Sequence, residues 1–130
     1  MAYVRSFREL EVYKASRSLA VDIFTISKRF PKEETYSLTD QIRRSARSVG
    51  AQIAEAWGKR RYVNHFISKL TDADSELYET QHWIEVARDC SYISSEEADK
   101  LLVKCSFIGK MLFTMIGKAD MFCLKPEVHT

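Results

Sequence analysis

The chain has 130 residues and a mass of 15.1 kDa, the size of one domain with a buried core. Hydrophobic residues make up 45% and charged residues 29% of it, and only four glycines and two prolines interrupt it, a composition that favours helices over turn-rich strand folds. No stretch has the roughly 20 apolar residues that a membrane span requires, because Lys110 divides the most apolar run, residues 107–117.

The cysteine spacing indicates the cellular compartment, and the distribution of charge along the chain indicates the kind of partner. Cys90, Cys105 and Cys123 form no Cys-x-x-Cys pair, so we expect reduced thiols and a cytoplasmic protein. The net charge of +2 hides a division along the chain. Residues 1–69 carry 14 basic and 7 acidic side chains, whereas residues 70–130 carry 6 basic and 11 acidic ones. This asymmetry indicates a charged partner surface.

The first two predicted helices follow from apolar spacing and a proline. A helix over about residues 7–29 is indicated by Leu10, Tyr13, Ala20, Ile23, Phe24 and Phe30, and Pro31 ends it. A second helix begins near Leu38, with Ser37 or Thr39 as its N-cap. Its apolar stripe consists of Leu38, Ile42, Ala46, Val49, Ile53 and Ala56.

The second predicted helix also carries small residues on more than one face. They are Ser45, Ala46, Ser48, Gly50, Ala51, Ala54 and Ala56. Either this helix crosses a neighbour closely inside the bundle, or part of the small surface is a subunit interface, since a bundle core needs only one stripe. The pattern leaves both alternatives open. The interface alternative assigns the contact to Ser48, Ala51, Ala54 and Trp57.

The third predicted helix is long, begins after Asn64 as N-cap, and keeps a seven-residue apolar period. Its core residues are Phe66, Leu70, Ala73, Leu77, Thr80, Ile84 and Ala87. Before the fourth helix, Ser94 and Glu97 form a capping box, in which the serine accepts an amide proton and the glutamate reaches back. The fourth helix carries Ala98, Leu101, Leu102, Cys105, Ile108, Leu112, Met115 and Ala119.

Four amphipathic helices with short connections bury their seams best as an antiparallel up-down-up-down four-helix bundle, an all-α fold. We expect one domain over residues 1–120 and a flexible tail over residues 121–130. Within the core, Ile53, Leu77 and Leu101 are predicted to be buried.

Motifs for catalysis or metal binding are few. Glu79 and His82 have the Glu-x-x-His spacing of carboxylate-bridged di-iron bundles, but such a site needs a second motif and two further inward glutamates, and no second motif is present. The sequence contains no nucleophile with its base, no glycine-rich phosphate loop and no zinc spacing. We therefore expect no metal site, no cofactor and no enzymatic activity.

A cationic segment at and after the second helix is the strongest functional signal. Residues 41–61 hold six cations and one acid, Glu55; the cations are Arg43, Arg44, Arg47, Lys59, Arg60 and Arg61. Cations near a helix C-terminus also complement its dipole, and a basic face is often only solvated. Trp57 and Tyr62 add rings on which bases can stack, although Trp57 alternatively packs in the core. We expect the six cations to bind RNA or DNA.

Three segments together resemble a known family. They read FRELEVYKAS, RFPKEETYSLTDQIRRSARSVGAQIAEAWGKRRY and SKLTDADSELYETQHWIEVA. The chain resembles, over about residues 7–119, the small four-helix-bundle proteins encoded in intervening sequences of bacterial 23S ribosomal RNA genes. The most specific portions are Phe30-Pro31 with Glu34 and Tyr36, the run over residues 38–44, and residues 53–55.

The resemblance implies a bundle that assembles as a ring-shaped homopentamer. Relatives include the accessory variability determinant of diversity-generating retroelements, a similar bundle that binds nucleic acid and a reverse transcriptase. This chain departs from the commoner pattern at residues 50–52, which read Gly-Ala-Gln where Pro-Ser-Asn is usual, and at Ala56, which replaces a glycine.

A ring requires two different surfaces on each subunit. The small residues of the second helix and the basic and acidic halves of the chain are candidates for these surfaces, with cations pairing to a neighbour's Asp72, Glu76 or Glu79. Two functions result: a non-enzymatic oligomer that binds nucleic acid through its basic face or, alternatively, an oligomeric scaffold that recruits a partner enzyme and uses its cations for subunit or partner contacts.

Overall fold

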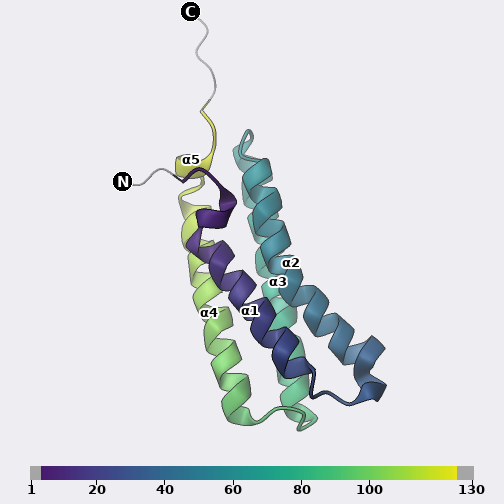
Figure 1. Cartoon of the computed structure of the whole chain (residues 1–130). Coiled ribbons are helices and arrows are strands. Elements are labelled where there is room, and N and C mark those ends of the chain that lie inside the picture. The colour runs from purple at the N-terminus through teal and green to yellow at the C-terminus, as the bar shows by residue number, and fades with distance from the viewer. Residues whose placement is uncertain (1–3, 126–130) are drawn as a thin grey trace, which may run out of the picture.

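The computed structural model describes residues 4–125, and within this range it contains helices and no strand. Its four long helices are α1 (Glu11–Ser27), α2 (Asp40–Gly58), α3 (Val63–Asp89) and α4 (Ser95–Gly117). Figure 1 shows them packed lengthwise, each running opposite to the one before it. Because α2 and α4 each contact both α1 and α3, the order around the bundle is α1–α2–α3–α4. The predicted all-α four-helix bundle is confirmed.

One apolar core runs the length of the bundle. The seven residues predicted for the seam of α3 are all buried, so that helix keeps one face to the core through 27 residues. Leu77 packs against Gly109 of α4, where an added Cβ would lie 3.6 Å from Leu77 Cδ2. Ile53, Leu77 and Leu101 are exposed by 0%, 1% and 6%, so their predicted burial is confirmed.

The first helix is shorter than predicted and buries a different stripe. Residues 7–9 form a separate 3-10 turn, and α1 begins only after Leu10, whose backbone is extended. Its buried residues are Val12, Ser16, Leu19, Ile23 and Ser27. Tyr13, Ala20 and Phe24, predicted as core, lie beside this stripe because two small serines occupy the positions where α2 approaches closely. Each serine hydroxyl donates to a carbonyl of its own helix and is thereby satisfied.

Of the predicted N-caps, Thr39 holds the expected position, Ser37 and Asn64 do not, and the capping box of the fourth helix is confirmed. Thr39 holds the N-cap position of α2 without a side-chain bond, because the π-helical turn Thr35–Thr39 leads directly into that helix. Ser37 Oγ instead donates to Glu34 Oε1 at 2.6 Å. α3 begins at Val63, so Asn64 lies within its first turn. The capping box of Ser94 and Glu97 is present as predicted.

Contacts between loops close each end of the bundle. At one end, Tyr92 donates its hydroxyl proton to Glu34 Oε2 at 2.7 Å and lies with its ring centroid 5.7 Å from that of Phe30. At the other end, the short helix α5 (Ala119–Phe122) extends into residues 121–130, the segment expected to be a flexible tail. Phe122 stacks on Phe66, and residues 126–130 of the expected tail lie outside the described range.

No helix within residues 4–125 is long and apolar enough to cross a membrane.

Candidate nucleic-acid interface

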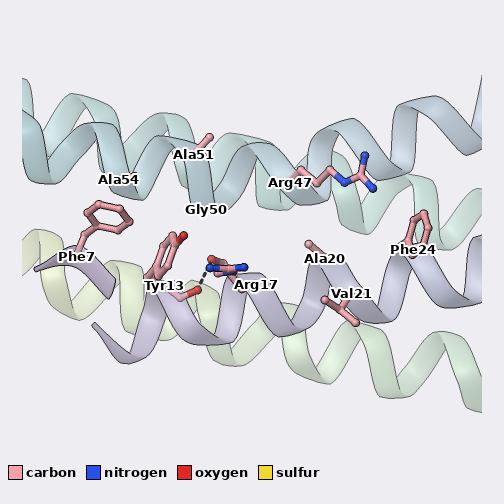
Figure 2. Close-up of a pocket in the computed structure, with 11 residues that line it drawn as sticks. Phe7, Tyr13, Arg17, Ala20, Val21, Phe24, Arg47, Gly50, Ala51 and Ala54 are labelled. Atoms are coloured by element: carbon pink, nitrogen blue, oxygen red, sulfur yellow. Dashed lines mark hydrogen bonds between the residues drawn. The ribbon is translucent and has the colours of Figure 1, made fainter. Parts of the chain in front are cut away.

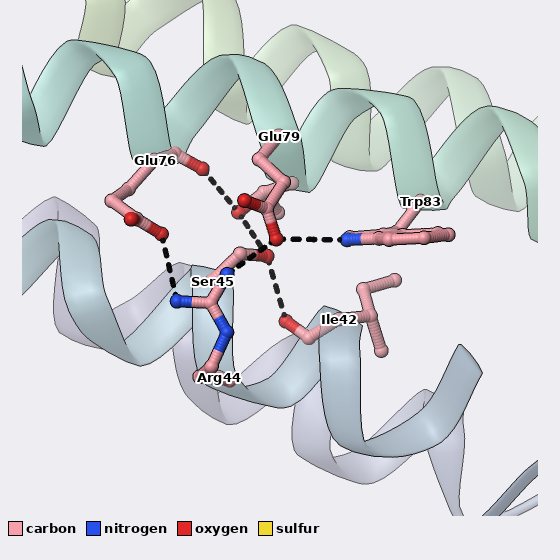
Figure 3. Close-up of polar contacts among 7 residues, drawn as sticks. Ile42, Arg44, Ser45, Glu76, Glu79 and Trp83 are labelled. Atoms are coloured by element: carbon pink, nitrogen blue, oxygen red, sulfur yellow. Dashed lines mark hydrogen bonds and ion pairs between the residues drawn. The ribbon is translucent and has the colours of Figure 1, made fainter. Parts of the chain in front are cut away.

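The six predicted cations do not form one surface, and Arg44, although exposed, is paired with two carboxylates of its own chain. Its Nη2 donates to Glu79 Oε2 at 2.5 Å and its Nη1 to Glu76 Oε2 at 3.3 Å, across the α2–α3 contact (Figure 3). Glu79 also accepts a hydrogen bond from Trp83 Nε1 at 3.0 Å. Hydrogen bonds from Trp83 and Arg44 lower the pKa of Glu79, and the bond to Glu79 raises the pKa of Arg44.

A buried pair of hydroxyl groups lies beside this network. Thr80 Oγ1 and Ser45 Oγ are 2.9 Å apart, and both residues are fully buried. Arg44, Glu76 and Glu79 therefore join α2 to α3 within one chain. The hypotheses that Arg44 binds nucleic acid, and that Glu76 and Glu79 pair with a neighbour's cations, are not supported by this arrangement.

Arg43 and Arg47 instead turn toward α1, where they gather with Lys28 around the ring of Phe24. The guanidinium carbons of Arg43 and Arg47 lie 4.8 and 5.5 Å from the ring centroid, and Lys28 Nζ lies 4.7 Å from it. Among the described residues, no carboxylate comes within 4.0 Å of any of these three cations. We call these four residues the Phe24 cluster.

The sequence pattern missed half of this cluster. Phe24 was assigned to the core because of its helical spacing, and Lys28 drew no attention because it stands apart from the cationic run of α2. The available signal was that Lys28 lies four residues after Phe24, on the same helix face.

Between α1 and α2 lies an open hollow of about 480 Å³, which we call the α1–α2 groove (Figure 2). It is lined by Phe7, Tyr13, Ser16, Arg17, Ala20, Val21, Phe24, Arg47, Gly50, Ala51 and Ala54. Two of the predicted interface residues, Ala51 and Ala54, are on its wall. Ser48 lies beside the groove in a shallower hollow with Asp40 and the arginines of α2.

The small residues of α2 fall into a buried group and a surface group. Gly50 is buried at the crossing with α1, where an added Cβ would lie 3.1 Å from Ser16 Oγ. Ser45, Ala46 and Ala56 are likewise buried in the bundle. Ser48, Ala51 and Ala54 remain at the surface. The small residues of α2 are therefore divided between a close helix crossing and an exposed surface.

At the C-terminal end of α2, Trp57 is half-buried and its ring is covered. The Arg60 guanidinium carbon lies 3.6 Å from the Trp57 ring centroid, and Arg60 Nε donates to the Trp57 carbonyl oxygen at 2.8 Å. Arg60 thus satisfies a carbonyl of the last helical turn, as a structural cation does. Lys59 and Arg61 are exposed, and neither forms an ion pair within residues 4–125.

The Glu-x-x-His motif makes no metal site. Glu79 is engaged by Arg44 and Trp83, and the exposed His82 ring packs against the Trp83 ring at 4.7 Å between centroids. Across the described part of the chain, no three His, Cys, Asp or Glu side chains gather where they could hold a metal ion.

Comparison with known proteins identifies the family. No curated protein matches the chain. A crystal structure of a protein of unknown function from the S23 ribosomal protein family of Bacteroides thetaiotaomicron is 32% identical, with a TM-score of 0.73, over 81% of this chain and 97% of that one. The family model described as 23S rRNA-intervening sequence protein matches residues 8–114. The chain belongs to the 23S rRNA-intervening sequence protein family.

Proposed function

We propose that this protein is a non-enzymatic, oligomeric helical bundle that binds RNA or DNA through the basic face of α1 and α2. The Phe24 cluster carries the proposal, because three like charges meet at one ring and no carboxylate among residues 4–125 pairs with them. Like charges held this close repel one another, and a bound phosphate chain relieves that repulsion.

Arg43 is held in position before any ligand arrives. Its Nε donates to Ser27 Oγ at 2.7 Å, and Ser27 is only 2% exposed and fixed in turn by the Phe24 carbonyl. The two terminal nitrogens of the guanidinium group stay available for a phosphate, which arginine contacts with two parallel hydrogen bonds. A pre-positioned donor loses less side-chain entropy on binding than a free one.

Lys59 and Arg61 supply a second basic group at the far end of α2. From Arg43 to Gly58, the last residue of α2, the helical rise is about 22 Å, and Lys59 and Arg61 follow directly, so one long polyanion can contact both groups. A ring-shaped homopentamer, which the family resemblance implies, repeats these groups and strengthens binding by multivalency. The sequence contains no recognisable base-reading motif, so we expect contacts to phosphates and little sequence preference.

A matched pair of neighbouring arginines tests the proposal. We expect labelled single-stranded RNA or DNA of mixed sequence to bind at low salt, measured by fluorescence anisotropy, and to weaken steeply between about 50 and 200 mM salt. Arg43→Gln with Arg47→Gln should weaken binding at least about tenfold and reduce the salt slope by about 2. Arg44→Gln is the control, because its guanidinium group is already paired with Glu76 and Glu79.

Two results would contradict the proposal. One is a wild-type protein that binds neither RNA nor DNA at low salt. The other is an Arg44→Gln variant that loses as much affinity as the double variant, since the Phe24 cluster would then have no special role.

A second candidate function is the scaffold that recruits a partner enzyme. An apolar hollow of about 450 Å³ between the start of α1, the end of α4 and α5 favours it. Met111 and Met115 lie in its wall, and flexible methionine surfaces suit the docking of partner helices. If this function holds, Phe107→Asp should abolish partner binding and leave nucleic-acid affinity unchanged.

A further inference from the structure

The face formed by α3 and α4 carries two large exposed aromatic side chains. Tyr78 of α3 is 66% exposed and Phe113 of α4 is 80% exposed. The contact between Leu77 and Gly109 sets the register of these antiparallel helices. Phe113 lies one turn beyond Gly109 and Asp74 about one turn before Tyr78, so both aromatics lie near Asp74.

Asp74 is a partly buried carboxylate without a partner among the described residues. It accepts no hydrogen bond there, and no cation lies within 4.0 Å of it. Burial raises the pKa of its carboxyl group. Such a group costs free energy until a cation reaches it.

The α1–α2 groove has the complementary properties. Its wall of Ala20, Gly50, Ala51 and Ala54 has room for a large side chain. Arg17 lies at its edge, with its guanidinium carbon 5.8 Å from the Tyr13 ring centroid and no carboxylate within 4.0 Å in residues 4–125 (Figure 2). A cation beside a surface of small residues thus faces outward on one side of the bundle, and an anion between two aromatics faces outward on the other.

Both surfaces lie at the same level along the bundle. Ser45 is level with Thr80 across the α2–α3 contact, so Gly50, five residues further along α2, is level with Ser75, next to Asp74. Gly50 also contacts Ser16, next to Arg17. When two copies lie side by side at the same level along the bundle axis, Asp74 of one copy is therefore level with Arg17 of the other.

We propose that the α3–α4 face of one copy docks into the α1–α2 groove of a second copy, with Phe113 and Tyr78 over the small residues and Asp74 against Arg17. This inference rests on the self-association included in the proposed function and assigns the two surfaces that make it. Because α1–α2 and α3–α4 lie on opposite sides of the bundle, the contact is head-to-tail, the type of contact from which a cyclic ring is built. Phe24 and Arg47 line the groove, whereas Lys28 and Arg43 lie outside it and stay free for phosphates.

Charge reversal tests the pairing. We expect Arg17→Asp and Asp74→Arg each to give monomers by light scattering at micromolar concentration, with helical circular dichroism spectra unchanged. The double variant Arg17→Asp/Asp74→Arg should regain the wild-type mass, because every groove then meets an oppositely charged face. Phe113→Ser should also dissociate the assembly and, at an exposed position, should not affect folding.

Lys14→Asp is the matched control. It makes the same charge change one turn before Arg17, at a side chain that pairs with Glu11 and lies outside the groove, so it should stay assembled. An assembly that survives Arg17→Asp, or a double variant that remains monomeric, overturns the pairing. A monomeric wild type overturns this inference together with the proposed self-association. Nucleic-acid binding by the monomeric variants is measured separately and should be weaker than that of the wild type, because the multivalency of the ring is lost.

Discussion

Arg43 and Arg44 are neighbours in the sequence with the same side chain, and their surroundings give them different roles. Arg44 lies toward α3 and meets two carboxylates, whereas Arg43 lies toward α1 and meets a serine and a phenylalanine. Consecutive residues on a helix are about 100° apart around its axis, so neighbours in sequence face different helices. The number of charges along a helix therefore does not indicate which cations are unpaired.

At the same scale, buried and exposed apolar residues should differ sharply in their effect on stability. Leu77→Ala removes a fully buried side chain in contact with α4 and should lower the free energy of unfolding by about 2–5 kcal/mol. Val103→Ala, at a residue that is 65% exposed, should change it by less than about 0.5 kcal/mol. Urea denaturation followed by circular dichroism measures both. Equal losses of stability in the two variants would mean that α4 does not bury the face of α3 that carries Leu77.

At the scale of the elements, the contact between the two loops at one end of the bundle depends on the ionisation of Glu34. Hydrogen bonds from Ser37 and then from Tyr92 lower the pKa of Glu34, and the bond to Glu34 raises the pKa of Tyr92 to about 12. A carboxylate with a lowered pKa stabilises the fold at pH values above its ordinary pKa. That contribution is lost as the pH falls through its pKa in the folded protein.

Tyr92→Phe should therefore be less stable than the wild type at pH 7, because it loses the hydrogen bond to Glu34. The difference should shrink as the pH falls through the lowered pKa of Glu34, because the protonated carboxyl group is a weaker hydrogen-bond acceptor. Chemical denaturation of both proteins at pH 7 and pH 3 provides the comparison. A difference that stays the same at both values would show that the Glu34 carboxylate contributes nothing through this bond.

For the whole molecule, Gly50 and Ala51 separate folding from assembly. Gly50→Trp places a ring in the buried crossing with α1, where even a Cβ would lie 3.1 Å from Ser16 Oγ, and should unfold the bundle. Ala51→Trp fills the open α1–α2 groove and should leave a folded monomer. Circular dichroism and light scattering together distinguish the outcomes. A folded, fully assembled Ala51→Trp protein would remove the groove from the subunit interface.

Much of the fold follows from local pattern. The seven-residue period of residues 66–87 and the capping box of Ser94 and Glu97 are found as predicted, because a buried face and a capped end depend on residues within a few turns of one another. The predictions failed where another helix decides the outcome. Phe24 looked like a core residue by spacing, yet serines fill the stripe that α2 covers, and small polar residues are invisible to an apolar pattern.

The sequence alone was sufficient to establish four amphipathic helices, the family resemblance, the buried seam of α3 and a basic segment around α2. Only the tertiary structure decided which cations are paired, which small residues of α2 are buried, and that Lys28 joins Phe24, Arg43 and Arg47. The physical reason is the range of the interactions. Helix formation and capping depend on neighbours in sequence, whereas an ion pair or a groove depends on side chains from separate helices, whose approach is settled by packing.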